Sequence, residues 1–319
     1  MRLVMMGTGP FAVPMFAALL ASRHEVAALI TRPMPPPKGR EKSPTNPMRD
    51  LAESRGLSLH TPDSINTEEG LAVLRQIAPD LLAVCDYGQI LSPEALSIAP
   101  LGGINLHASL LPKYRGAAPI HWALWNGERE TGVSVIHMTP RLDGGPILVQ
   151  RVASIGDEET QPELEQRLAA IGVSAVQEAI DMLEKWDRTS SIGTPQDASQ
   201  ATKAPRLKKE MGAVDWTKSA DEIRNQVRAL KPWPGTFTFW RRAGQEPLRL
   251  VIDAARVAQA EDSAPGNVFV SDGQQLIVAT GQGGLSIEAI APAGKRHMSA
   301  AEFLRGYRVR VGDKFGAVT

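Results

Sequence analysis

The sequence of 319 residues contains a single cysteine, Cys85. One cysteine excludes an internal disulfide and a cysteine-based zinc site, and such usage is expected in a reducing compartment. No stretch approaches the ~18 consecutive apolar residues that a membrane-spanning helix needs. Gly7, Gly9 and Pro10 interrupt the apolar N-terminus before a signal peptide is complete. We therefore expect a cytoplasmic protein that does not enter a membrane.

The chain also lacks net charge, because 35 Lys and Arg residues balance 35 Asp and Glu residues. This balance is uneven along the chain. Residues 1–202 hold 17 basic against 23 acidic residues, a net charge of −6, whereas residues 203–319 hold 18 against 12, a net charge of +6. A basic C-terminal part is typical of a protein that meets a polyanion, although a well-solvated surface gives the same count.

Strand and helix patterns alternate through the first part of the chain. Residues 3–6 predict a strand, residues 11–20 a helix and residues 26–31 a second strand. The alternation continues to a long amphipathic helix over residues 161–186. It predicts an α/β fold, with a Rossmann-like, mostly parallel sheet that has helices on both faces.

A change of composition then separates a second, smaller domain. Residues 189–206 are rich in Ser, Thr, Gln, Ala and Pro, which is linker composition. After a helix over residues 219–230, short apolar segments alternate with Gly and Pro turns, which predicts an OB-like β-barrel. The expected strands are residues 248–254, 266–270, 275–279 and 285–291. The predicted boundaries are 1–188 for the first domain, 189–206 for the linker and 207–319 for the C-terminal domain.

The first Gly-rich turn has two interpretations. Gly7, Gly9 and Ala12 match the Gly-x-Gly-x-x-Gly/Ala dinucleotide fingerprint between a strand and a helix. A nicotinamide site would normally add an acid at the end of the second strand, but that strand ends Ile30-Thr31-Arg32. The turn is therefore either an NADP site that uses Arg32 or a sharp bend that requires glycine.

A second cluster of polar residues follows a later strand. Asn105 and His107 are two residues apart at the carboxyl end of that strand, so their side chains share a face at the edge where open α/β sheets bind ligands. Asp143, in a Gly-rich loop, is placed to orient the imidazole and hold it charged. These three residue types can serve catalysis or ordinary structure, and their order alone does not decide between the two.

Longer motifs surround these residues. Residues 105–112 read Asn-x-His-x-Ser-Leu-Leu-Pro, and residues 142–145 read Leu-Asp-x-Gly. Together with residues 7–12, 86–91 and the Pro-Trp-Pro-Gly of residues 232–235, they make the chain resemble the 10-formyltetrahydrofolate-dependent formyltransferase superfamily over essentially its whole length. The Pro-Trp-Pro-Gly segment and the C-terminal barrel are similar to the tRNA-directed branch.

This resemblance implies a one-carbon transferase. Its formyl group comes from 10-formyltetrahydrofolate and goes to the free amino group of methionyl initiator tRNA for translation initiation, without a metal. The matching catalytic residues are Asn105, His107 and Asp143. The matching folate-binding residues are Tyr87, Gly88, Ser109, Leu110, Leu111 and Pro112. A monomer is the family expectation.

Two groups of cations are predicted to contact the tRNA backbone, because Lys and Arg neutralise phosphates. One group lies on the Pro-rich loop after the second strand and consists of Lys38, Arg40 and Lys42. The other lies next to the linker and consists of Lys203, Arg206, Lys208 and Lys209. Arg224, Arg228, Lys295 and Arg296 are expected to extend the basic face of the barrel. A solvated proline-rich connector is the alternative for the loop.

The chain departs from the family pattern at two places. Asp86 replaces the usual small residue before the Tyr-Gly pair, and Gly7-Thr8-Gly9-Pro10 replaces the common Gly-Thr-Pro opening. If the Asp86 carboxylate points inward, it alters the polarity of the pocket, and the new opening is expected to alter the turn. Besides the NADP enzyme, two alternatives remain: a formyltransferase for another amine, such as a nucleotide-linked amino sugar, and a non-catalytic RNA-binding protein.

Overall fold

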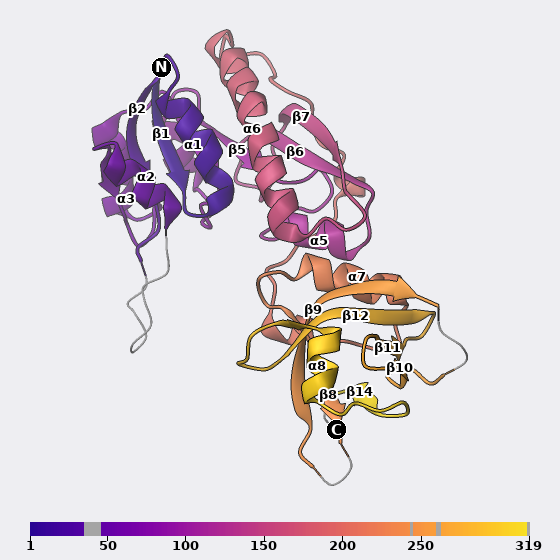
Figure 1. Ribbon diagram of the computed structural model, residues 1–319. Coiled ribbons are helices and arrows are strands. Elements are labelled where there is room, and N and C mark those ends of the chain that lie inside the picture. The colour runs from indigo at the N-terminus through magenta and orange to yellow at the C-terminus, as the bar shows by residue number, and fades with distance from the viewer. Residues whose placement is uncertain (35–45, 243–244, 260–262, 318–319) are drawn as a thin grey trace. The chain divides into compact units, whose positions relative to one another are not determined.

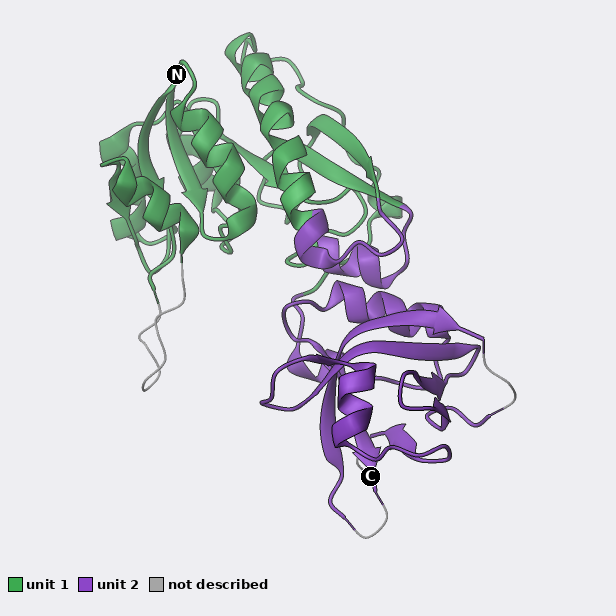
Figure 2. Ribbon diagram, in the orientation of Figure 1, with its two compact units in different colours: residues 1–119, 130–154, 165–205 green, residues 120–129, 155–164, 206–319 purple. Residues whose placement is uncertain are grey.

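The computed structural model describes residues 1–34, 46–242, 245–259 and 263–317 (Figure 1). The chain forms two compact units (Figure 2). Unit 1 comprises residues 1–119, 130–154 and 165–205, and unit 2 comprises residues 120–129, 155–164 and 206–319. The predicted linker thus lies almost wholly within unit 1, where residue Thr194 pairs with Ile147 and Lys203 with Arg115 in isolated bridges.

Unit 1 contains a seven-stranded sheet in the order β3-β2-β1-β4-β5-β6-β7. The strands are β1 (Arg2–Gly7), β2 (Glu25–Ile30), β3 (Ser58–His60), β4 (Leu81–Cys85), β5 (Gly103–His107), β6 (Glu130–His137) and β7 (Ile147–Ser154). Pairing is parallel from β3 to β5 and antiparallel from β5 to β7. The helices among them are α1 (Val13–Leu20), α2 (Pro47–Ser54), α3 (Glu68–Ile77), α4 (Pro93–Ile98), α5 (Pro119–Trp125) and α6 (Gln161–Glu184).

Successive side chains of each strand point to opposite faces of the sheet, and helices cover both faces. Val4, Leu82 and Val84 belong to one buried cluster with side chains of α3 and α4. On the opposite face, a Cβ added at Gly172 of α6 would lie 2.6 Å from Leu106 Cδ2, so the helix packs directly on β5. Period-two alternation thus buries both faces of the parallel strands.

Unit 2 contains an antiparallel barrel in the strand order β10-β11-β12-β9-β8-β14, with β13 paired to β12. The strands are β8 (Thr236–Arg241), β9 (Leu248–Ala258), β10 (Val268–Ser271), β11 (Leu276–Ala279), β12 (Gly284–Pro292), β13 (Met298–Ser299) and β14 (Lys314–Gly316). An isolated bridge connects Asn267, just before β10, to Lys314 of β14, so the barrel is nearly closed. The helices are α7 (Ala220–Ala229) and α8 (Ala300–Gly306), and 3-10 turns lie at Pro10–Ala12, Ala198–Gln200 and Lys209–Gly212.

The predicted fold class is confirmed, and so is the start of α7. Ser219 and Glu222 form a reciprocal capping box at that helix. The sequence patterns missed α4, because its six residues are too few to show a helical period, although Ser92 caps it through a bond from Ala95 N. They also missed β8, which has six residues, and the edge strands β13 and β14, which have two and three residues.

Candidate active site

The proposed catalytic residues lie at the carboxyl edge of the sheet in unit 1. Strand order reverses between β1 and β4, and open α/β sheets bind ligands at this kind of switch point. Asn105 and His107 are on β5, the next strand, where Asn105 pairs with Val84 of β4. Asn105 is partly exposed, and its side chain has no hydrogen-bond partner among the described residues. Its amide is therefore open to a ligand.

The His107 ring is fixed from two sides. Only 6% of the residue is exposed, and its Nε2 lies 2.9 Å from the carbonyl oxygen of Tyr114. Because a carbonyl can only accept, Nε2 must carry a proton. Nδ1 then faces Asp143 Oδ2 at 3.8 Å, which is an ion-pair distance when the ring is protonated. The structure thus brings His107 and Asp143 together, as predicted, with Nδ1 beyond hydrogen-bond range of the carboxylate.

The loop that carries Asp143 is held in place by partners that sequence reasoning did not identify. Asp143 Oδ2 accepts a 2.8 Å hydrogen bond from the Gly116 amide, and Gln196 donates to the carbonyl oxygens of Asp143 and Gly145. Asp143 itself has a left-handed backbone, with φ of 46°. Nothing in the linker composition singled out Gln196.

The polar groups of the Ser109–Pro112 turn form hydrogen bonds with other groups of the protein. Ser109 Oγ donates to the Lys113 carbonyl oxygen at 2.7 Å, and Ser134 Oγ donates to the Ser109 carbonyl oxygen at 2.7 Å. The Leu111 amide donates to Ser134 Oγ, and the Leu111 carbonyl accepts from Gln150. Leu110 and Pro112 are partly exposed, so the turn offers a ligand chiefly apolar surface.

Tyr87 and Gly88 differ in exposure, because the Tyr87 side chain is buried and Gly88 is at the surface. The Tyr87 side chain is 2% exposed within the core, and its hydroxyl has no partner among the described residues. Burial raises the pKa of Tyr87 to about 12, with Arg32 opposing, so the phenol stays neutral. Gly88 is exposed and has a φ of +78°. Any contact of this segment with a folate must therefore come from its backbone rather than from the phenol.

The two departures from the family pattern meet in space. A Cβ added at Gly9 would lie 1.7 Å from Asp86 Oδ2, so the carboxylate occupies the place of the missing side chain. Asp86 has a φ of 51°, and although the residue is exposed, withdrawal of solvent from its carboxylate and then Glu165 raise its pKa to about 6, with Arg32 opposing. This contact was not visible in the sequence, where the two residues are far apart.

The first glycine of the turn also has a packing role. A Cβ at Gly7 would lie 2.6 Å from the Cys85 carbonyl oxygen, because β1 and β4 approach closely there. The glycines are therefore explained by close packing, without a dinucleotide. Cys85 is fully buried, and burial raises the pKa of its thiol well above the usual range. A buried, protonated thiol is a poor nucleophile.

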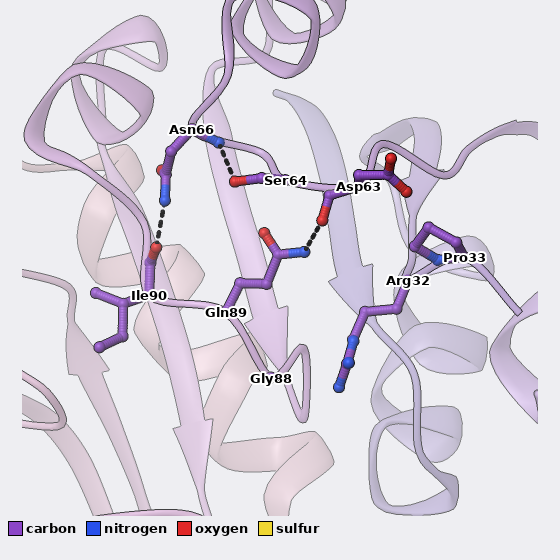
Figure 3. A pocket seen from close by; sticks show the side chains of 8 residues that line it. All are labelled: Arg32, Pro33, Asp63, Ser64, Asn66, Gly88, Gln89 and Ile90. Atoms are coloured by element: carbon purple, nitrogen blue, oxygen red, sulfur yellow. Dashed lines mark hydrogen bonds between the residues drawn. The ribbon is translucent and has the colours of Figure 1, made fainter. Parts of the chain in front are cut away.

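A polar cavity of about 510 Å³ borders Gly88 at the same edge (Figure 3). Its polar side chains come from Arg32, Asp63, Ser64, Asn66 and Gln89. Among the residues that the structure describes, no group of three or more His, Cys, Asp or Glu is placed to hold a metal ion. Within the same residues, no helix is both long and apolar enough to cross a membrane.

The predicted tRNA-binding cations have different outcomes. Lys203, Arg206, Lys208 and Lys209 are exposed, and none forms an ion pair among the described residues. Lys38, Arg40 and Lys42 lie outside the described residues. The expectation for Arg228 is wrong, because it is 8% exposed and donates to the carbonyl oxygens of Gly156 and Glu159. Its guanidinium is therefore used within the fold, where it joins α7 to the segment before α6.

Comparisons with known proteins agree in both parts of the chain. The family model described as formyl transferase matches residues 1–180, and the model described as formyl transferase, C-terminal domain, matches residues 206–308. The methionyl-tRNA formyltransferase of Rhodopirellula baltica is 48% identical, and the alignment covers 98% of this chain and 96% of the relative. That of Solibacter usitatus is 40% identical, with 99% of each chain covered.

The fold is shared with a solved structure at lower identity. WlaRD, a sugar 3N-formyl transferase crystallised in the presence of dTDP and 5-N-formyl-THF, matches with a TM-score of 0.64 and 19% identity. The match covers 93% of this chain and 99% of WlaRD.

Proposed function

The chain belongs to the methionyl-tRNA formyltransferase family, and from this membership we propose that it transfers the formyl group of 10-formyltetrahydrofolate to the free amino group of methionyl initiator tRNA. The observation that supports this most directly is the arrangement of His107, whose Nδ1 is turned toward Asp143 and which lies two residues after Asn105 on β5. The product is formylmethionyl-tRNA, which serves translation initiation.

The proposed mechanism assigns one role to each of the three side chains. The co-substrate supplies an electrophilic formyl carbon, and the amine that attacks it places negative charge on the formyl oxygen. Asn105 donates a hydrogen bond to this oxygen, and the protonated Nδ1 of His107 stabilises the same charge. Asp143 keeps His107 charged and correctly turned, and accepts the amine proton through water. As the new C–N bond forms and the old one breaks, that proton returns to the departing nitrogen.

The three catalytic side chains do not determine which amine receives the formyl group. The same chemistry serves any amine, and WlaRD is by its name a sugar formyltransferase. Similarity to WlaRD at 19% identity extends to the fold alone, whereas the relatives with 40 to 48% identity over nearly the whole chain are methionyl-tRNA formyltransferases. The exposed cations Lys203, Arg206, Lys208 and Lys209 favour a polyanionic acceptor.

The remaining assignments belong to the same proposal. Residues 1–188 form the catalytic domain, residues 189–206 the linker and residues 207–319 the tRNA-binding domain. Tyr87, Gly88 and the Ser109–Pro112 turn line the folate site, with the Tyr87 contribution made by its backbone. The protein acts as a monomer in the cytoplasm, where translation takes place. Lys38, Arg40 and Lys42 contact the tRNA together with the cations at residues 203–209.

The test is formyl transfer to methionyl initiator tRNA by the wild type and by Asn105→Ala, His107→Ala and Asp143→Asn. We expect each variant to lose about 100-fold or more in kcat, because each removes a group that stabilises the transition state. KM for both substrates should change little, and His60→Ala, a histidine outside the site, should retain full activity.

Two outcomes would contradict the proposal at different points. If the enzyme formylated a small amine but not methionyl-tRNA, the assignment of methionyl-tRNA as the acceptor would be wrong, whereas the formyl-transfer reaction would stand. Full activity in His107→Ala and Asp143→Asn would overturn the assignment of the catalytic residues. Uncharged tRNA is the control for amine dependence.

A further inference from the structure

The cavity beside Gly88 is built around the Arg32 side chain. Arg32 follows β2, and its guanidinium extends over Gly88 in the loop after β4 (Figure 3). A Cβ added at Gly88 would lie 3.2 Å from Arg32 Nη1 and 3.5 Å from Arg32 Cδ. The φ of +78° at Gly88 also disfavours any other residue. Arg32 therefore lies directly against the backbone of the segment that is proposed to contact the folate.

The polar wall of the cavity is already fixed by hydrogen bonds. Gln89 Nε2 donates to the Asp63 carbonyl oxygen at 3.0 Å, and Asn66 Nδ2 donates to the Ile90 carbonyl oxygen at 2.8 Å (Figure 3). These bonds connect the segment after β3 to the segment after β4. The cavity is thus bounded by two segments that hold each other in place.

Arg32 is the charged group available to a ligand there. Among the described residues it forms no ion pair and no side-chain hydrogen bond, and the Asp63 carboxylate points away from it (Figure 3). A guanidinium presents a planar set of donors that suits a carboxylate or a phosphate. We propose that Arg32 binds the glutamate carboxylates of the folate co-substrate, an inference that rests on the proposed function.

The position of Arg32 fits the length of the folate molecule. Its strand, β2, is separated from β5 by β1 and β4, and three strand spacings of ~4.8 Å put the two strand ends about 14 Å apart. In the co-substrate, a benzene ring and an amide separate the reacting nitrogen from the glutamate, which amounts to roughly 10 Å at ordinary bond lengths. The Arg32 side chain extends toward β4 and covers the remaining distance.

Binding measurements with two ligands test this assignment. Tetrahydrofolate carries the glutamate, whereas tetrahydropteroate ends at the benzoate and lacks it. By calorimetry we expect Arg32→Gln to weaken tetrahydrofolate binding about 10-fold, the loss typical of one exposed charge-assisted contact, and to leave tetrahydropteroate binding unchanged. Arg55→Gln, which removes an exposed arginine after α2, is the matched control and should bind both ligands like the wild type.

Three results would overturn the assignment. Equal effects of Arg32→Gln on both ligands, or no effect on either, would show that Arg32 does not recognise the glutamate. A raised KM for methionyl-tRNA with unchanged folate binding would assign the guanidinium to a tRNA phosphate instead. These failures are separate from failure of the proposed function, in which the wild type would bind tetrahydrofolate without formylating methionyl-tRNA, or would bind neither ligand.

Discussion

Asp86, at the carboxyl edge of the sheet, makes the stability of the protein depend on pH. Its pKa is raised from 3.8 to about 6 in the folded protein, first by withdrawal of solvent and then by Glu165. Between these two values the folded state holds the proton more tightly than the unfolded chain does. The free energy of unfolding therefore falls as pH rises from about 4 to 6, and the ionised carboxylate destabilises the fold above this window.

We expect Asp86→Asn to remove this penalty. At pH 7.5 the variant should unfold about 1 to 2 °C above the wild type, a small gain because the residue as a whole is exposed and Arg32 offsets part of the penalty. Near pH 4 the two melting temperatures should coincide. Thermal unfolding from pH 4 to 8 measures the difference, with Glu246→Gln as a control that removes an exposed acid of unit 2. A gain that is the same at every pH would show that ionisation is not the cause.

At the scale of elements, α7 is anchored by Arg228 to the segment before α6. Besides its bonds to Gly156 and Glu159, the guanidinium donates to Asn225 Oδ1 at 3.0 Å. In Arg228→Met these acceptors lose their partner, so we expect the free energy of unfolding to fall by about 1 to 3 kcal/mol. Urea denaturation measures this loss.

Arg305→Met is the matched control for this prediction, because Arg305 is exposed on α8 and its loss should cost under ~0.5 kcal/mol. The affinity for tRNA gives a second readout. A structural role predicts that folded Arg228→Met binds tRNA like the wild type. If the variant kept its stability but bound tRNA more weakly, Arg228 would instead belong to the predicted tRNA-binding surface.

At the scale of the whole molecule, the opposite charges of the two parts of the chain predict salt-dependent tRNA binding. Lys203, Arg206, Lys208 and Lys209 are exposed and free of ion pairs among the described residues. If each contacts one phosphate, replacing all four by Gln should reduce the slope of log affinity against log salt concentration by about 3. Binding isotherms from 50 to 300 mM salt measure this slope. The sequence of the tRNA should matter little to the change, because phosphate contacts carry no base readout.

The folate-dependent reaction provides the control for this variant. Tetrahydrofolate binding should keep its wild-type affinity at every salt concentration, because the four cations are not assigned to that site. An unchanged salt slope for tRNA would mean that the phosphates are contacted elsewhere, with Lys38, Arg40 and Lys42 as the next residues to replace.

Local patterns in the sequence determined much of this protein. The alternation of strands and helices, the Ser219 cap and the position of Asn105 and His107 at a strand end all follow from periods and turns within short segments. The resemblance that the surrounding motifs carry also predicted that His107 and Asp143 lie close together, and their Nδ1 and Oδ2 atoms are 3.8 Å apart.

Only the tertiary structure decided which distant groups meet. It placed the Asp86 carboxylate in the space left by Gly9 and the Arg32 guanidinium over Gly88. It also buried Arg228 against the carbonyl oxygens of Gly156 and Glu159 rather than exposing it on a basic surface. The physical reason is that a sequence pattern records which face of an element is buried, whereas the partner of a charged side chain depends on how separate elements pack. Charge counts alone could not distinguish a buried arginine from an exposed one.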